Sequence, residues 1–185
     1  MNVVTNPIAL AALNRALSAA RTGPAPRPRY SSRTADKFVI RGYSELFEEL
    51  GGIGQHQGRS KNSEMVAAIL EALSGNMRMK SVIMALRAYL GHDLADKVLA
   101  EVPDFILAEC KVTDQFVIRL PPSVRDTIRE GVSSAISAKG ASVRTMNQWV
   151  LNALEQWVNL QRQQYALTTA AIAIDQTVFI TAENH

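Results

Sequence analysis

The sequence predicts a mostly helical protein with two small strand–helix–helix units and a helical insert between them. Three observations lead to this fold class. The tetrapeptide Phe-Val-Ile-Arg occurs at residues 38–41 and again at residues 116–119, with an aspartate two residues before each copy. Each copy is followed by two segments whose apolar residues have helical spacing. The last helices of the two units share one apolar phase, which indicates an internal duplication.

The chain opens with a basic segment, residues 1–33, that we expect to be an unpacked arm. It carries five arginines and no acidic residue, and residues 23–30 are rich in proline. Proline-rich segments favour extended backbone, and a basic arm is attracted to polyanions. A solvated tail without a function explains the composition equally well, and an organellar transit peptide is a third alternative.

Both copies of the tetrapeptide alternate like strands with one buried face. Phenylalanine and isoleucine point to one side in each copy, and the residues between them point to the other. A single strand among helices must find partners for its backbone groups, and pairing the two strands in an antiparallel ribbon would supply them. The outward face of that ribbon would carry Lys37, Val39, Arg41, Gln115, Val117 and Arg119.

A helix is predicted after each strand. In the first unit, residues 34–74, Ser44 is placed to cap a helix that opens with three glutamates. Three glycines within residues 51–54 favour a short or broken helix, since each costs about 1 kcal/mol relative to alanine. In the second unit, residues 112–160, Pro122 stands at the start of a helix that runs to about Ala138. The unequal first helices favour pairing of like units across a homodimer, and an intrachain pseudo-dimer is the alternative.

The second helix of each unit begins at a recognisable start signal. Ser60 opens one helix, and Thr145 opens the other with Gln148 three residues later, as in a capping box. Aligning Asn62 with Asn147 brings the apolar residues of both helices into the same phase. A unit of about 40 residues seldom buries enough surface to fold alone, so each unit is expected to pair with another.

The remaining segments carry weaker signals. Residues 75–111, the insert, are predicted to form one or two helices whose apolar face packs on the core or makes an oligomer contact. Residues 161–185 form a C-terminal extension, in which the last helix continues through residue 164 and residues 171–181 alternate like an additional strand.

This pattern resembles the ribbon-helix-helix family of DNA-binding proteins, of the Arc type. Residues 38–73 follow the family pattern without a gap, and residues 58–64 carry its turn and the start of its second helix. The second copy, residues 116–158, is similar more loosely, and two copies in one chain also resemble accessory proteins of conjugative plasmids.

The resemblance implies that the ribbon enters the major groove of double-stranded DNA and that its outward side chains touch base edges. These base-contacting positions are Lys37, Val39, Arg41, Gln115, Val117 and Arg119. It further implies that the amino ends of the second helices hold phosphates, at Ser60, Lys61, Asn62, Thr145, Met146 and Asn147. Valine at the middle outward position departs from the usual polar reader, which favours weak discrimination or contacts with thymine methyl groups.

Other functional classes find little support in the sequence. The glycine-rich residues 51–58 lack the ending of a phosphate-binding P-loop, and the three histidines lack the spacing of metal ligands. We therefore predict no catalytic residue, no cofactor and no metal site. One cysteine and the lack of a long apolar run favour a cytoplasmic protein with no membrane partner.

The function predicted from the sequence is sequence-specific binding of double-stranded DNA by a transcriptional repressor or regulator. Two alternatives stay open. One is an accessory DNA-binding protein of conjugation, and the other is an antitoxin-like protein whose residues 159–185 occupy a toxin.

Overall fold

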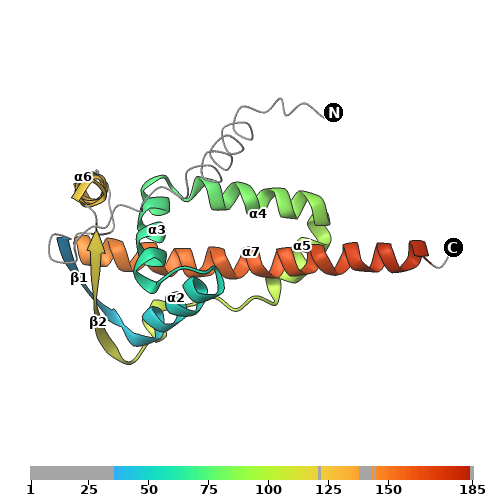
Figure 1. The fold of residues 1–185 in the computed structure, drawn as a ribbon, viewed down its shortest axis with the longest axis horizontal. Coiled ribbons are helices and arrows are strands. Elements are labelled where there is room, and N and C mark those ends of the chain that lie inside the picture. The colour runs from blue at the N-terminus through green and yellow to red at the C-terminus, as the bar shows by residue number, and fades with distance from the viewer. Residues whose placement is uncertain (1–35, 121, 138–142, 144, 184–185) are drawn as a thin grey trace, which may run out of the picture. The chain divides into compact units, whose positions relative to one another are not determined.

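The computed structural model describes residues 36–120, 122–137, 143 and 145–183. The predicted basic arm lies outside the described residues. The described part is mostly helical, as predicted (Figure 1). In chain order its elements are β1 (Asp36–Tyr43), α2 (Ser44–His56), α3 (Lys61–Leu73), α4 (Met77–Leu90), α5 (His92–Ala100), the 3-10 turn η1 (Leu107–Glu109), β2 (Thr113–Leu120), α6 (Pro122–Ser137) and α7 (Met146–Glu183).

The two strands form an antiparallel ribbon within one chain. Asp36 lies opposite Leu120 at one end of the ribbon, and Tyr43 lies opposite Thr113 at the other. The ribbon thus pairs unlike strands of one chain, as in the intrachain alternative, rather than like strands. Both strands have the same alternation, so either can serve as the other's partner, and a covalent link keeps the partner at a high effective concentration.

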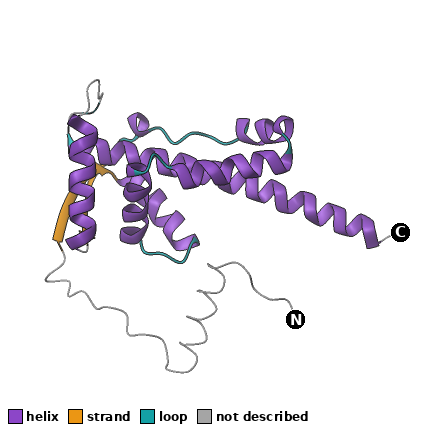
Figure 2. Ribbon diagram, turned by 90° about the horizontal axis from the view of Figure 1, so that it is seen from above, coloured by secondary structure: helices purple, strands orange, loops and turns teal. Residues whose placement is uncertain are grey.

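The inward face of the ribbon packs on the core. Ile40 and Ile118 are fully buried, and the Phe116 ring centroid lies 5.9 Å from that of Phe47 on α2. Helices α2 and α3 and the first turns of α7 supply the rest of this core, and Figure 2 shows the ribbon at one end of α7. Their buried apolar residues are Leu46, Phe47, Leu50, Met65, Ile69, Val150, Leu154 and Trp157.

Helix α2 is continuous, although its glycines favour a short or broken helix. A Cβ atom at Gly54 would lie 3.1 Å from the carbonyl oxygen of Arg59, and one at Gly51 would lie 2.8 Å from Lys61 Cε. These glycines therefore let α2 approach the turn and the first residue of α3, and this packing offsets their low helix propensity. The predicted cap is also corrected: Ser44 is the first helical residue, and Tyr43 precedes it without a side-chain cap bond.

Helix α7 runs without a break through the region where the alternation predicted a strand at residues 171–181. That prediction is wrong. A strand there would need a partner for its backbone groups, whereas an established helix satisfies them within the segment as it grows. Residues 75–111, for which one or two helices were predicted, contain α4 and α5, and both helices pack on α7. None of the helices in the described part of the chain is long and apolar enough to span a membrane.

The segment that leads into β2 is fastened to two helices. The amide side chain of Asn159 on α7 accepts from Phe105 N at 2.7 Å and donates to its carbonyl oxygen at 3.0 Å. Glu45 on α2 accepts from the backbone N–H groups of Lys111 and Val112 at 2.9 and 3.1 Å. The Lys111 bond is the main reason that the pKa of the Glu45 carboxyl lies below its usual value. These bonds fix where β2 begins.

One exposed glycine of α2, Gly52, and one buried glycine, Gly54, give a matched test of this packing. Nothing lies within 4 Å of a Cβ atom at Gly52, so Gly52→Ala should raise the free energy of unfolding by about 0.5–1 kcal/mol. Gly54→Ala should lower it by about 1 kcal/mol, because the added methyl group meets backbone oxygen of the next turn. Urea unfolding of both variants measures the difference. Equal stabilisation by the two substitutions would show that α2 does not need this approach.

Candidate nucleic-acid interface

The outward face of the ribbon presents the six residues that the sequence predicted there, and all six are exposed. The register sets them opposite one another in three cross-strand pairs. Lys37 faces Arg119, Val39 faces Val117, and Arg41 faces Gln115. The two valines at the centre are 42% and 43% exposed, a large fraction for aliphatic side chains.

The three cationic side chains on this face, Lys37, Arg41 and Arg119, form no salt bridge in the described part of the chain. Like charges directly opposite each other destabilise a ribbon, and Lys37 and Arg119 form such a pair. A surface of this kind is stabilised when a polyanion lies against it.

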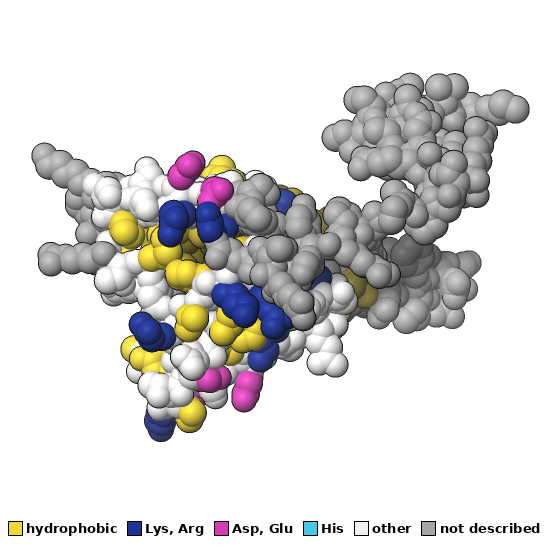
Figure 3. All heavy atoms as spheres, turned by 60° about the vertical axis from the view of Figure 1, so that its left-hand side comes forward, with side chains coloured by type: hydrophobic (Ala, Val, Ile, Leu, Met, Phe, Trp, Pro, Cys, Tyr) yellow, Lys and Arg dark blue, Asp and Glu magenta, His cyan; other side chains and the backbone are white. Residues whose placement is uncertain are grey.

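Two arginines of α6, of which Arg125 is paired with Asp126 at 2.9 Å, lie at one end of the ribbon. Arg125 and Arg129, one helical turn apart, line the same hollow of about 170 Å³ as Lys37. Sequence reasoning missed them, although their spacing of four residues on a predicted helix was a usable signal. At the other end, Arg41 shares a shallow hollow with Asp114 and Gln115. Figure 3 turns the ribbon end of Figure 1 forward and shows several lysine and arginine side chains among hydrophobic ones, with a few aspartate and glutamate side chains beside them.

Two asparagines brace the edges of the ribbon. Asn62, the second residue of α3, accepts from the backbone N–H of Arg119 at 2.7 Å and donates to its carbonyl oxygen at 3.1 Å. Asn147, the second residue of α7, makes the same two bonds to Arg41 at 2.9 and 2.8 Å. Each side chain thus occupies the place of a further strand at a ribbon edge, which sequence reasoning did not foresee.

The braces also place a helix amino end beside each edge of the ribbon. Ser60 accepts from Ser63 N at 3.2 Å, and Thr145 accepts from Gln148 N at 3.2 Å, so both predicted start signals are confirmed. The backbone N–H groups of the first two residues of each helix precede the first intrahelical bonds, Glu64 N to Ser60 O and Trp149 N to Thr145 O. Such amides can bind a phosphate oxygen.

The side chains at these helix starts have different surroundings. Lys61 Nζ lies 5.9 Å from the centroid of the Phe116 ring, and Met146 is a half-buried member of the core. The Asn62 and Asn147 side chains already bind the ribbon. A phosphate at either helix start would therefore contact backbone amides rather than the asparagine side chains. The Ser60 hydroxyl and the Lys61 ammonium group would be available to it at α3, and the Thr145 hydroxyl at α7.

A buried polar contact joins α3 and α7 behind the ribbon. Glu64 on α3 is fully buried, and its Oε1 accepts from Trp157 Nε1 on α7 at 2.7 Å. Arg59 Nε lies 2.9 Å from the other carboxylate oxygen. An unpaired buried carboxylate is costly, so this pairing holds the Arg59 turn, α3 and α7 in one arrangement. In the described residues no group of three or more His, Cys, Asp or Glu side chains could hold a metal ion.

Comparison with known proteins agrees with the geometry of β1, α2 and α3. Residues 32–80 match the family model of the Arc-like DNA binding domain. The transcription factor AmrZ of Pseudomonas ogarae (strain DSM 112162 / CECT 30235 / F113) is 40% identical over 50 residues, which are 27% of this chain and 46% of that protein. The match thus covers less than half of that relative. No solved structure matched the chain.

The contribution of the two asparagine side chains to the free energy of unfolding should be measurable. Asn62→Ala and Asn147→Ala each remove two hydrogen bonds to exposed strand groups, so each should lower the free energy of unfolding by about 1–2 kcal/mol. Asn152→Ala, at an exposed position of α7, is the matched control and should change it by less than about 0.5 kcal/mol. Thermal or urea unfolding provides the measurement. Asparagine variants as stable as the control would mean that the braces contribute nothing.

Proposed function

We propose that this protein is a transcriptional regulator that binds double-stranded DNA through the ribbon of β1 and β2. The observation that carries the proposal is the exposed face with Lys37, Arg41 and Arg119, which lack ion-pair partners in the described part of the chain. The Arc-like match at residues 32–80 and the similarity to a transcription factor support the same function.

In this proposal β2, α6 and the first turns of α7 act as a second ribbon-helix-helix unit, so that one chain forms a pseudo-dimer. The correspondence of the two halves supports it. Asn62 and Asn147 make equivalent bonds to the opposite strand. Ser60 and Thr145 cap equivalent helices, and the paired apolar positions Met65 and Val150, and Ile69 and Leu154, are all buried.

The ribbon would lie in the major groove with its outward side chains toward the bases. Arginine and lysine donate to O6 and N7 of guanine, glutamine bridges N6 and N7 of adenine, and a valine methyl group packs on the methyl of thymine. Arg41 and Arg119 are therefore the strongest candidates for base discrimination, with Lys37 and Gln115 beside them. Val39 and Val117, at the centre, would contact thymine methyl groups.

The amino ends of α3 and α7 would hold phosphates on either side of the groove. Their open backbone amides and helix dipoles favour an anion. Ser60 and Lys61 would contribute at one edge and Thr145 at the other, while Met146 and Asn147 would offer their backbone amides. These contacts would fix the orientation of the ribbon on the duplex without reading its sequence.

The proposal predicts separate effects on specificity and on fold. Arg41→Ala and Arg119→Ala should each weaken binding to a selected site by about 1–3 kcal/mol, and less on an unrelated duplex, while unfolding stays as in the parent. Arg87→Ala, on α4 and paired with Asp96, is the matched control and should bind as the parent does. Fluorescence anisotropy at several salt concentrations measures both affinity and salt dependence. Parental binding by both ribbon variants would rule out groove reading.

The two ends of the ribbon predict an asymmetric DNA site. Pseudo-symmetry relates Arg41 to Arg119, but it relates Lys37 to Gln115, so the halves differ in one reader. Sites selected from random duplexes should therefore lack a palindrome. Lys37→Gln gives both halves the same readers and should shift selection toward a palindromic site. A palindrome selected by the parent protein would contradict single-chain reading.

A further inference from the structure

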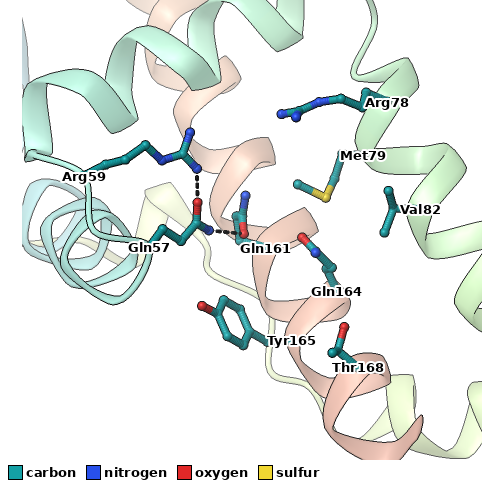
Figure 4. Close-up of a pocket in the computed structure, with 9 residues that line it drawn as sticks. All are labelled: Gln57, Arg59, Arg78, Met79, Val82, Gln161, Gln164, Tyr165 and Thr168. Carbon is teal, nitrogen blue, oxygen red and sulfur yellow. Dashed lines mark hydrogen bonds between the residues drawn. The ribbon is translucent and has the colours of Figure 1, made fainter. Parts of the chain in front are cut away.

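A half-open cavity of about 340 Å³, lined by both polar and apolar side chains, lies between the turn that precedes α3 and the facing sides of α4 and α7. Its volume lies at the small end of the range of ligand sites, which is about 300–1,000 Å³. Figure 4 shows Arg59 and Arg78 entering from two different elements and pointing toward the same space. Met79 and Val82 of α4 form an apolar wall.

The lining of this cavity is rich in hydrogen-bond donors. Arg78 donates through Nε to Glu71 at 2.6 Å, its side chain is 68% exposed, and its terminal nitrogens point toward the cavity in Figure 4. Arg59 faces Glu64 through Nε and donates through one terminal nitrogen to Gln57. Each guanidinium group is thus paired with a carboxylate through Nε and keeps terminal N–H groups for other partners.

A chain of amides continues this donor surface onto α7. Gln57 Nε2 donates to Gln161 Oε1 at 2.8 Å, and Gln161 is only 2% exposed. Because the oxygen of Gln161 is used in this bond, its NH₂ group is available as a donor at the wall. Gln164, Tyr165 and Thr168 complete the lining on the same helix. Convergent guanidinium and amide donors of this kind suit a carboxylate or a phosphate.

The cavity is connected to the turn that opens α3. Arg59 N donates to the carbonyl oxygen of Gly54 at 2.7 Å, and Ser60, the cap of α3, follows directly. A ligand that binds Arg59 and Arg78 together would join this turn to α4. It would thereby hold the helix start that positions Asn62 against the ribbon.

We propose that the cavity binds a small carboxylate or phosphate compound between Arg59 and Arg78, and that the bound compound stabilises the start of α3. The regulatory consequence, a change in DNA affinity, rests on the proposed function, whereas binding of the anion does not. Binding is therefore tested first on the full chain without DNA.

Isothermal titration with inorganic phosphate and with succinate tests the site, using chloride at equal ionic strength as the blank. At least one of the two anions should bind with a Kd of about 1 mM or lower. Arg78→Gln should weaken that binding at least tenfold, because it removes a guanidinium group that pairs only with a half-buried carboxylate outside the core. Arg87→Gln, on the same helix but paired with Asp96 away from the cavity, is the matched control and should bind as the parent does.

The outcomes are distinct. Binding that is lost in Arg78→Gln and kept in Arg87→Gln supports the site. Binding of neither anion to the parent, or equal binding in both variants, overturns it. Unfolding curves of the two variants show whether a loss of anion binding comes from the site or from a destabilised fold. An Arg78→Lys variant keeps the positive charge. If it restores part of the affinity, the charge at the cavity, rather than the packing of the arginine, is what binds the anion. DNA affinity measured without any added anion tests the proposed function separately.

Discussion

The antiparallel pairing of β1 and β2 is the constraint on which the rest of the structure depends. An isolated two-stranded ribbon is marginally stable in water, and both edges of this one would expose unpaired backbone groups. Two features stabilise it. Its inward face packs Ile40 and Ile118 onto α2, α3 and α7, and Asn62 and Asn147 bind the edges at Arg119 and Arg41. Because the stabilising contacts lie on the inner face and at the edges, the outward face is left for charged side chains.

Forming the ribbon within one chain has a consequence for symmetry. In a homodimer with two-fold symmetry each residue appears on both halves of the interface, so the two strands cannot differ. A single chain has no such restriction. Here Lys37 and Gln115 occupy related positions, α6 contributes Arg125 and Arg129 near one end, and α2 carries glutamates such as Glu45 in the corresponding helix. The two strands keep the same alternation and equivalent asparagine contacts, while the charges around them differ.

The sequence was sufficient to predict features that depend on neighbouring residues alone. A period of two placed the outward and inward side chains of both strands correctly, and Ser60 and Thr145 marked the starts of α3 and α7. The sequence was insufficient to predict features that depend on contacts between distant segments. The glycines of α2 look like helix breakers until Gly54 is seen against the Arg59 carbonyl oxygen. Residues 171–181 alternate like a strand, yet they continue α7, whose hydrogen bonds satisfy the backbone groups within the segment. The identity of the strand partner and the cavity at Arg59 depend on long-range placement that periodicity does not carry.

Helix α7 links the ribbon to the cavity, and the nature of that link determines how a signal could pass. Its first turn holds Arg41 through Asn147, its middle holds Glu64 through Trp157, and its next turns line the cavity with Gln161 and Tyr165. A continuous helix transmits little by bending, so α7 is better regarded as a fixed frame. The turn at Arg59 lies on this frame, lines the cavity and is followed by the cap of α3, so a ligand in the cavity would act on this turn. Coupling between the cavity and the ribbon therefore requires only that this turn has two arrangements of different stability. The buried Glu64 carboxylate binds both Arg59 and Trp157. An arrangement in which Arg59 leaves this carboxylate would be the less stable one, because an unpaired buried charge is costly.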